Sequence, residues 1–222
     1  MKTNEERDGS VDPYELLRRT DWESVQNCRP GVAPETPEIL LGLLDGDPRV
    51  QGAALRNLIE DVCREAVLSS AAAPAARYVA AVLPHPATRT PVTDRTAAEE
   101  REHGPRGRFP LRLGLLAWLG DTAAEAVVQQ YTATGEQADV NAFLKAAPAL
   151  YEAVRRFLKD PSPEIREAAL GALLPLLTLP ALSCEIPGLR ARVRELAASD
   201  GPHRWRAVDT LVYWGEDLSA LL

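Results

Sequence analysis

Histidine and cysteine are the side chains of this chain best suited to nucleophilic or metal chemistry, and there are three of each. A catalytic Ser or Cys needs a His and an acid beside it in the fold. Recognisable signatures include GxSxG around a nucleophilic Ser and HExxH at a metal site. No such spacing surrounds His85, His103 or His203. The cysteines form no CxxC pair, so neither a zinc site nor a disulfide framework is expected. The sequence therefore predicts no catalytic residue, no cofactor and no metal ligand.

One charged run could still supply metal ligands, because Glu99-Glu100-Arg101-Glu102-His103 brings carboxylates and an imidazole together. A run of this kind is more often the solvated face of a helix, which is the interpretation favoured here. A phosphate-binding loop is not indicated, since Gly104, Gly107 and Gly114 have the wrong spacing and precede no strand–helix unit.

The composition favours a helical, globular and acidic chain. Of the 222 residues, 45% are hydrophobic and only 5% aromatic, and the abundant alanine and leucine have high helix propensity. The net charge of -7 argues against nucleic-acid binding, which needs positive surface to neutralise phosphates. The stretch MKTNEERDGSVDP lacks the apolar segment of a signal peptide, and the longest apolar run, near 170–182, is too short to span a bilayer. We expect a cytoplasmic protein that binds neither nucleic acid nor membrane.

Start and stop signals divide the chain into about ten short helices. Asp12-Pro13 and Thr36-Pro37 each open a helix, and Asp45-Gly46-Asp47-Pro48 ends one helix and starts the next. Segment 84–108 is rich in Pro and charge and is expected to be a long loop with at most a helical turn near 95–102. Further helices are expected at 48–69, 74–83, 109–121, 122–131, 138–146, 148–159, 163–178, 187–199 and 202–214. No alternating pattern indicates a strand.

Three stretches resemble one another, which indicates an internal repeat. They are DPRVQGAALRNL (47–58), SPEIREAALGAL (162–173) and DGPHRWRAVDTL (200–211). The second and third start 38 residues apart and the first and second 115, close to three times 38. Small residues at this spacing let neighbouring helices pack closely. The matched pairs, each an Ala followed four residues later by a Leu, are Ala54 and Leu58, Ala169 and Leu173, and Ala207 and Leu211.

This pattern resembles the HEAT-repeat family, and most of all the short bacterial HEAT-like repeats named after phycobilisome lyases. The family motif has an Asp-Pro turn before Val-Arg-x-x-Ala-Ala-x-x-Leu, which Asp47-Pro48, Val50, Ala53-Ala54 and Leu58 match. The resemblance implies an all-α, right-handed α-solenoid of antiparallel helix pairs, with about four to five repeats. Residues 36–222 would form this repeat domain with the long loop 84–108, and residues 1–35 a tail and short capping helix.

The resemblance also assigns a structural role to two arginines. In the family, the residues equivalent to Arg166 and Arg204 pair with an acid of the neighbouring repeat. Gln51 replaces this arginine in the first copy, and His203 stands where Val or Ile is usual. The first and last repeats are therefore expected to be capping units, which solenoids need at their ends.

Outward-facing positions of the repeat helices are the candidates for a binding surface. An aromatic flanked by arginines, as in Arg204-Trp205-Arg206, has the composition of an interface anchor; packing of this Trp under the carboxy-terminal tail is the alternative. Trp118 and Trp214 are expected in the core. We therefore expect a monomeric, non-enzymatic scaffold or adaptor that binds a protein partner through its solenoid surface. The candidate protein-binding residues are Arg56, Glu167, Trp205, Arg206 and Asp209.

Alternative functions stay open at this point. The acidic charge suits an immunity or antitoxin-like protein that neutralises a basic toxin. The likeness to phycobilisome-lyase repeats would suit a bilin lyase-like enzyme or a cofactor chaperone. The only candidates to anchor a tetrapyrrole are then Cys63 and Cys184, both in helical context. A HEAT-type alkylpurine glycosylase is disfavoured, because its concave surface must be basic to hold DNA.

Overall fold

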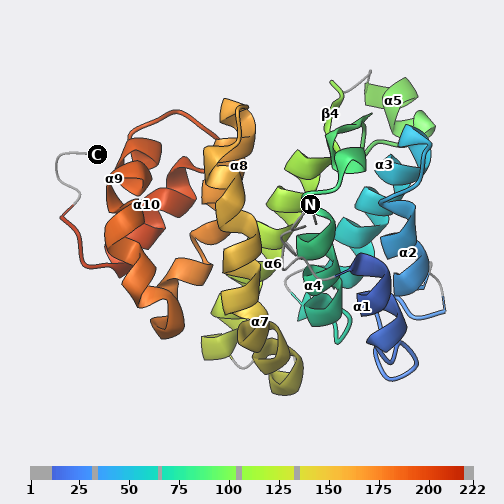
Figure 1. The fold of residues 1–222 in the computed structure, drawn as a ribbon, viewed down its shortest axis with the longest axis horizontal. Helices are drawn as coiled ribbons and strands as arrows, with labels where there is room; N and C mark the ends of the chain where they lie inside the picture. The colour runs from blue at the N-terminus through green and yellow to red at the C-terminus, as the bar shows by residue number, and fades with distance from the viewer. Residues whose placement is uncertain (1–11, 32–34, 65–66, 104–106, 133–135, 218–222) are drawn as a thin grey trace, which may run out of the picture.

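The computed structural model describes residues 12–31, 35–64, 67–103, 107–132 and 136–217 (Figure 1). Within these ranges the chain is mostly helical, with ten α-helices and four strands of two residues each. The predicted all-α class is confirmed. No helix in the described ranges has the length and apolar character needed to cross a membrane.

The elements follow one another with short connections. The helices are α1 (Pro13–Arg19), α2 (Thr36–Gly42), α3 (Pro48–Asn57), α4 (Ala72–Val82), α5 (Ala97–His103), α6 (Leu111–Thr132), α7 (Gln137–Arg155), α8 (Pro163–Leu173), α9 (Ile186–Ala197) and α10 (Arg204–Tyr213). The strands β1 (Cys63–Arg64) and β2 (Val67–Leu68) pair antiparallel, as do β3 (Pro91–Val92) and β4 (Phe109–Pro110). Short helical turns are η1 (Leu58–Val62, π-helical), η2 (Pro86–Arg89), η3 (Arg156–Lys159), η4 (Leu176–Thr178) and η5 (Pro180–Glu185).

Several helices begin where the sequence signals place them. The Asp47 carboxylate accepts a hydrogen bond from the Arg49 amide (2.8 Å), and Pro48 follows it in the first turn. Asp12 caps α1 in the same way. The Ser162 hydroxyl accepts from the Ile165 amide at the start of α8 (3.2 Å). Each cap satisfies an amide that has no partner within its own helix.

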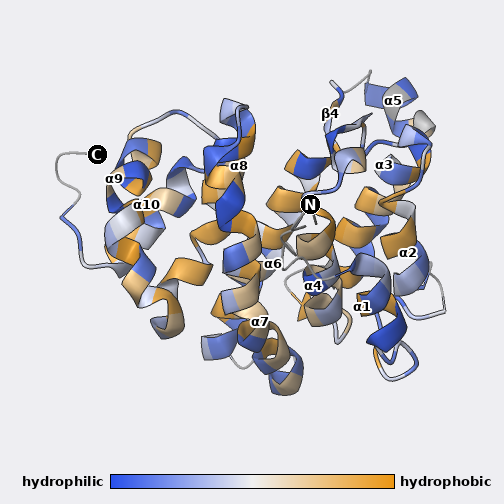
Figure 2. Cartoon of the chain, in the orientation of Figure 1, coloured by the Kyte–Doolittle hydropathy of each residue, from blue (hydrophilic) through white to orange (hydrophobic). Residues whose placement is uncertain are grey.

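The helices form an elongated array, with α1–α3 at one end and α9 and α10 at the other (Figure 1). Helix α2 packs on α3, α4 on α7, and α9 on α10, while α6 contacts α3, α4, α7 and α8. Apolar residues lie on the helix sides that face one another (Figure 2), and one cluster of buried side chains extends from α2 to α10. Helix α6 is therefore the central element of the core.

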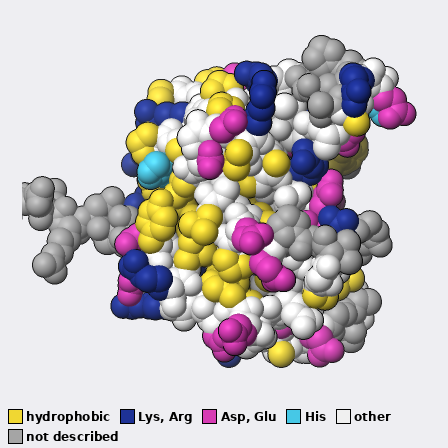
Figure 3. Space-filling model, turned by 90° about the vertical axis from the view of Figure 1, so that its right-hand side faces the viewer, with side chains coloured by type: hydrophobic (Ala, Val, Ile, Leu, Met, Phe, Trp, Pro, Cys, Tyr) yellow, Lys and Arg dark blue, Asp and Glu magenta, His cyan; other side chains and the backbone are white. Residues whose placement is uncertain are grey.

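The end formed by α2 and α3 keeps apolar side chains in solvent. Viewed from this end, hydrophobic side chains form a patch with acidic side chains beside it (Figure 3). Leu41 of α2 and Val50 of α3 are among the exposed large hydrophobic residues. Helix α1, which the sequence predicts as a capping helix, packs against α4.

Helix α6 differs from the sequence prediction, which ends one helix at Gly120-Asp121 and begins another at residue 122. The structure has a single helix that runs through Gly120. A Cβ atom at Gly120 would lie 2.9 Å from the Cα atom of Ala172 on α8 and 2.9 Å from Nη1 of Arg206. This glycine is therefore a close-packing position between helices, and tertiary contact overrides its usual helix-ending role.

Other boundaries also differ from prediction. The expected helices 138–146 and 148–159 are one helix, α7, with Pro148 exposed inside it. Segment 84–108 contains η2, β3 and α5, so it is no structureless loop. The helix expected over 48–69 ends at Asn57 and gives way to η1 and the β1–β2 hairpin. The helix expected over 163–178 ends at Leu173, before Pro175.

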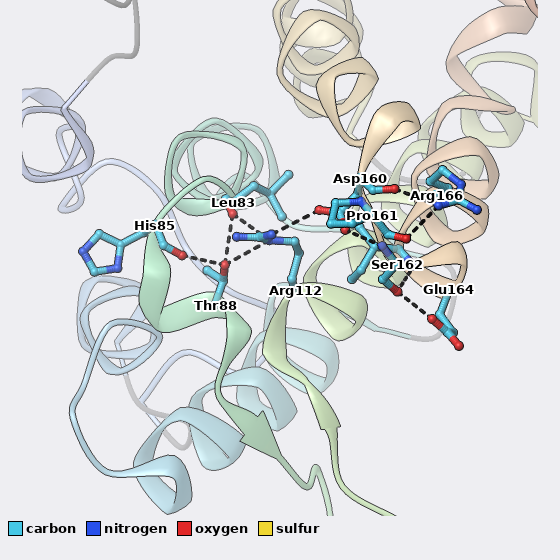
Figure 4. A network of polar contacts seen from close by, with 10 residues as sticks. Leu83, His85, Thr88, Arg112, Asp160, Pro161, Ser162, Glu164 and Arg166 are labelled. Carbon is cyan, nitrogen blue, oxygen red and sulfur yellow. Dashed lines mark hydrogen bonds and ion pairs between the residues drawn. The ribbon is translucent and has the colours of Figure 1, made fainter.

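A buried arginine of α6 connects α4 and η2 with the turn before α8 (Figure 4). Arg112 of α6 is 4% exposed, and its Nε donates to the Leu83 carbonyl at 2.9 Å and to the Thr88 hydroxyl at 3.1 Å. Its Nη1 lies 3.5 Å from the Asp160 carboxylate, and the guanidinium lies over the Phe157 ring at 4.9 Å. Burial lowers the pKa of Arg112 and the Asp160 charge raises it. One side chain thus connects the end of α4, η2 and the turn before α8.

The two arginines of the repeat motif do not act as the resemblance implies. Arg166 Nη1 donates to the carbonyls of Asp160 (2.8 Å) and Pro161 (2.9 Å), in the turn before its own helix. Arg204 Nε donates to the Ala197 carbonyl. Neither forms an ion pair with an acid in the described part of the chain. The prediction of acid pairing is wrong for both, because each guanidinium donates to backbone carbonyls instead.

Replacing Arg112 with Met removes the donors to Leu83 and Asp160 while keeping an apolar stem against Phe157. We expect the free energy of unfolding to fall by about 3 kcal/mol, the order found when one partner of a buried charge pair is removed. Urea unfolding followed by circular dichroism measures it. Arg77 is exposed, and Arg77→Met should change stability by less than about 0.5 kcal/mol. Equal stability of the two variants would contradict the role of Arg112.

Candidate functional site

An open groove of about 620 Å³ lies between α6 and α10. Its walls combine apolar, aromatic and charged side chains from the two helices, and Pro175 and Thr178 near η4 also line it. This combination suits the recognition of another molecule. The residues of the α10 wall are Trp205, Arg206, Asp209, Thr210 and Tyr213, and those of the α6 wall are Ala117, Asp121, Ala124, Val127 and Val128.

Helical spacing aligns the functional side chains of α10. Trp205, Asp209 and Tyr213 are four residues apart, so they share one face of the helix. The Trp205 side chain is 63% exposed and that of Tyr213 is 56% exposed. Trp205 is stacked under the Arg204 guanidinium at 4.9 Å; residues 218–222 of the tail, under which Trp205 would alternatively pack, lie outside the described residues. Two large rings therefore stand in solvent beside a carboxylate.

An ion pair sets the spacing of the groove walls. Nη2 of Arg206 on α10 lies 2.6 Å from the Asp121 carboxylate on α6, and Arg206 Nη1 lies 3.5 Å from the Gly171 carbonyl on α8. Toward the end of α6, the exposed rings of Tyr131 and Tyr213 lie near each other, and desolvation together with Tyr131 raises the pKa of Tyr213. The Arg206–Asp121 pair thus joins the two walls of the groove.

His203 supports the groove from beneath by packing. A Cβ atom at Gly171 would lie 2.5 Å from the His203 ring, so this imidazole fills the space above a glycine of α8. Its side chain forms no helix cap. Burial lowers the pKa of His203, and the Arg206 charge lowers it further, whereas Glu167 and Asp121 raise it. The imidazole is therefore uncharged near neutral pH.

A second cavity, of about 450 Å³, lies on the other side of α6 and shares Ala117 and Asp121 with the first. Carboxylates and apolar side chains line it together, so the acidic character continues across α6. Trp118, which lines this cavity, is only 3% exposed, as predicted for a core residue. Its lining residues include Leu55, Ile59, Asp94, Phe109, Leu113, Thr122 and Glu125.

The structure brings together three of the five predicted binding residues. Trp205, Arg206 and Asp209 line the α6–α10 groove. Arg56 instead donates to the Asp94 carbonyl at 3.3 Å. Glu167 is half-buried against Gly201, and its Oε1 has no hydrogen-bond partner within the described ranges. Neither residue lines the groove.

Sequence reasoning missed Asp121 and Tyr213. The two successive four-residue steps from Trp205 to Asp209 and from Asp209 to Tyr213 would have indicated the latter. Nothing in the sequence indicates that Asp121 faces Arg206, because they lie 85 residues apart and meet only through the close approach at Gly120.

The residues considered for metal or nucleophilic chemistry have structural partners or lie in solvent. The Thr96 amide donates to the Glu99 carboxylate (2.6 Å), and the Glu99 amide donates to the Thr96 hydroxyl, which is a capping box at the start of α5. His85 and His103 are exposed, and Cys28 and Cys184 are free thiols. Within the described ranges, no three His, Cys, Asp or Glu side chains gather closely enough to hold a metal ion.

Lowering the pH should destabilise the fold through His203. Its folded-state pKa lies below the ordinary value of 6.5, so below that pH the unfolded chain binds more protons and the free energy of unfolding falls. Above it, this contribution to stability is fully present. We expect the thermal unfolding midpoint to drop between about pH 7.5 and pH 5.5, and less in His203→Gln. His85→Gln, at an exposed histidine, should keep the wild-type pH dependence. Identical profiles for wild type and His203→Gln would disprove this role.

Comparisons with known proteins leave the family open. No protein-family model matches the chain, and neither curated proteins nor solved structures give a significant match. Membership of the HEAT-repeat family therefore stays a prediction that rests on the resemblance of the repeated stretches to the family motif.

Proposed function

We propose that this chain is a non-enzymatic scaffold that binds a protein partner through the α6–α10 groove. The observation that carries the proposal is the exposure of Trp205 and Tyr213 on one helix face beside Asp209. Trp, Tyr and Arg dominate the binding energy of protein interfaces when they stand in pockets. Exposed aromatic side chains of this size gain free energy when a partner removes them from water.

The packing of the helices supports an α-solenoid as the framework for this surface. Consecutive helices α2 and α3, and α9 and α10, pack as pairs, and α6 packs on α7 and α8. In a solenoid each repeat contacts its neighbours and the array offers one extended surface to a partner. The Ala and Gly positions at the helix contacts, such as Gly120 against Ala172, fit the close stacking of HEAT-like repeats.

The groove is also preorganised. Arg206 is paired with Asp121, is only 26% exposed in its side chain, and also lies 3.5 Å from the Gly171 carbonyl through its Nη1. A partner therefore loses less binding free energy to the ordering of side chains. An immunity or antitoxin-like role is one specific form of this proposal. The bilin lyase-like and cofactor-chaperone alternatives have no feature of the groove in their favour.

Replacing Trp205 with Ala should weaken partner binding without unfolding the protein. We expect a loss of about tenfold or more in affinity, because a central aromatic anchor contributes about 2 kcal/mol, and a change in unfolding free energy below about 0.5 kcal/mol. Tyr14, which is 51% exposed on α1 at the other end of the array, provides the matched control variant Tyr14→Ala.

The measurement is affinity purification of tagged wild type, Trp205→Ala and Tyr14→Ala from extracts of the native host, with quantitative mass spectrometry. A protein recovered with wild type and Tyr14→Ala but depleted with Trp205→Ala would support the groove. Equal recovery with all three chains would refute it.

A further inference from the structure

The two cavities beside α6 lie on either side of a ridge that Ala117 and Asp121 form, because these two residues line both cavities. A ligand that lies across this ridge would contact both, and we refer to the two cavities together as the combined groove. Four carboxylates line the combined groove, and they come from three separate parts of the chain: Asp94, Asp121, Glu125 and Asp209.

The arginine that lines the two cavities is paired with a carboxylate: Arg206 lies 2.6 Å from Asp121. Arg204 does not line them and stacks on the Trp205 ring. His203 is uncharged near neutral pH for the reasons given above. Asp209 and Glu125 form no ion pair within the described residues, so these two lining carboxylates keep an unbalanced negative charge. A partner that carries phosphates or carboxylates would be repelled, and a cationic one attracted.

The exposed rings of the groove favour the same kind of partner. Trp205 and Tyr213 flank Asp209 on one face of α10. The face of an aromatic ring attracts an ammonium or guanidinium group; Arg204 covers one face of Trp205 at 4.9 Å, and Trp205 remains 63% exposed. A carboxylate between two exposed rings would suit a lysine or arginine side chain through charge, ring face and apolar contact together.

We infer that the occupant of this groove is a cationic polypeptide segment of the partner, whose lysine or arginine side chains contact Asp209, Glu125 and the rings of Trp205 and Tyr213. The inference rests on the proposed scaffold function and names the chemistry of its partner. Apolar residues between the basic ones would contact Val127 and Val128 in the α6 wall.

The test uses two fluorescent peptides of equal length. In one, lysine and arginine alternate with leucine and alanine; in the other, glutamate replaces every basic residue. Fluorescence anisotropy measures binding to the full chain at low and at high salt. We expect the cationic peptide to bind, the glutamate peptide to bind at least about tenfold more weakly, and the cationic affinity to fall as salt screens the charges.

The double variant Asp209→Asn/Glu125→Gln removes two charges but keeps the shape of the groove. We expect it to bind the cationic peptide about tenfold more weakly, equivalent to about 1.4 kcal/mol. The control variant Glu38→Gln/Glu195→Gln removes the same charge from exposed positions on α2 and α9 and should bind as wild type does. Equal losses in both variants, or no preference of the wild type for the cationic peptide, would overturn the inference.

The same variants separate this inference from the scaffold function. If the host partner depends on Trp205 but is retained at wild-type level by Asp209→Asn/Glu125→Gln, the scaffold function stands and the cationic segment is wrong. If the partner does not depend on Trp205, the scaffold function at this groove fails, whatever the peptides show. Loss of the partner in both variants supports both proposals.

Discussion

Helix α6 approaches α8 so closely at Gly120 and Ala172 that no side chain fits between them, and the rest of the structure depends on this contact. The approach brings Asp121, the next residue, within reach of Arg206. The neighbouring residue of α8, Gly171, has no side chain, and the His203 ring at the start of α10 packs in the space above it. Eight residues before Gly120, Arg112 connects the start of α6 to the turn before α8. Helix α6 is thus fixed to its neighbours along its length, and the groove walls are fixed with it.

This arrangement explains why large apolar rings can remain in solvent without unfolding the chain. The core does not need Trp205 or Tyr213, because α10 is held by Ala207, Val208 and Leu211, which are buried on its opposite side. Exposure of the rings therefore costs hydration free energy that packing elsewhere offsets. Rigid support beneath an exposed aromatic surface is what a preorganised binding site requires.

Local signals in the sequence predict local structure well, and contacts between distant residues account for the differences. Asp12, Asp47 and Ser162 cap helices as their positions indicate, since a cap depends on amides two or three residues away. The continuous α6 could not be predicted, because the packing partner of Gly120 is Ala172. The same holds for Arg112, whose partners come from residues 83, 88 and 160. Of the groove, the α10 face was predictable from spacing, whereas the α6 wall was not.

In the proposed complex the two parts of the groove have different effects on binding. Exposed carboxylates such as Asp209 interact through water, where each ion pair contributes little to affinity, but their summed field speeds the encounter with a cationic segment. The rings of Trp205 and Tyr213 lose their hydration only after contact, so they slow dissociation. Raising the salt concentration should therefore reduce the association rate more than it raises the dissociation rate. A groove with carboxylates alone would attract basic segments but release them quickly. Because Asp209 lies between two rings, the same helix face would both speed association and slow dissociation.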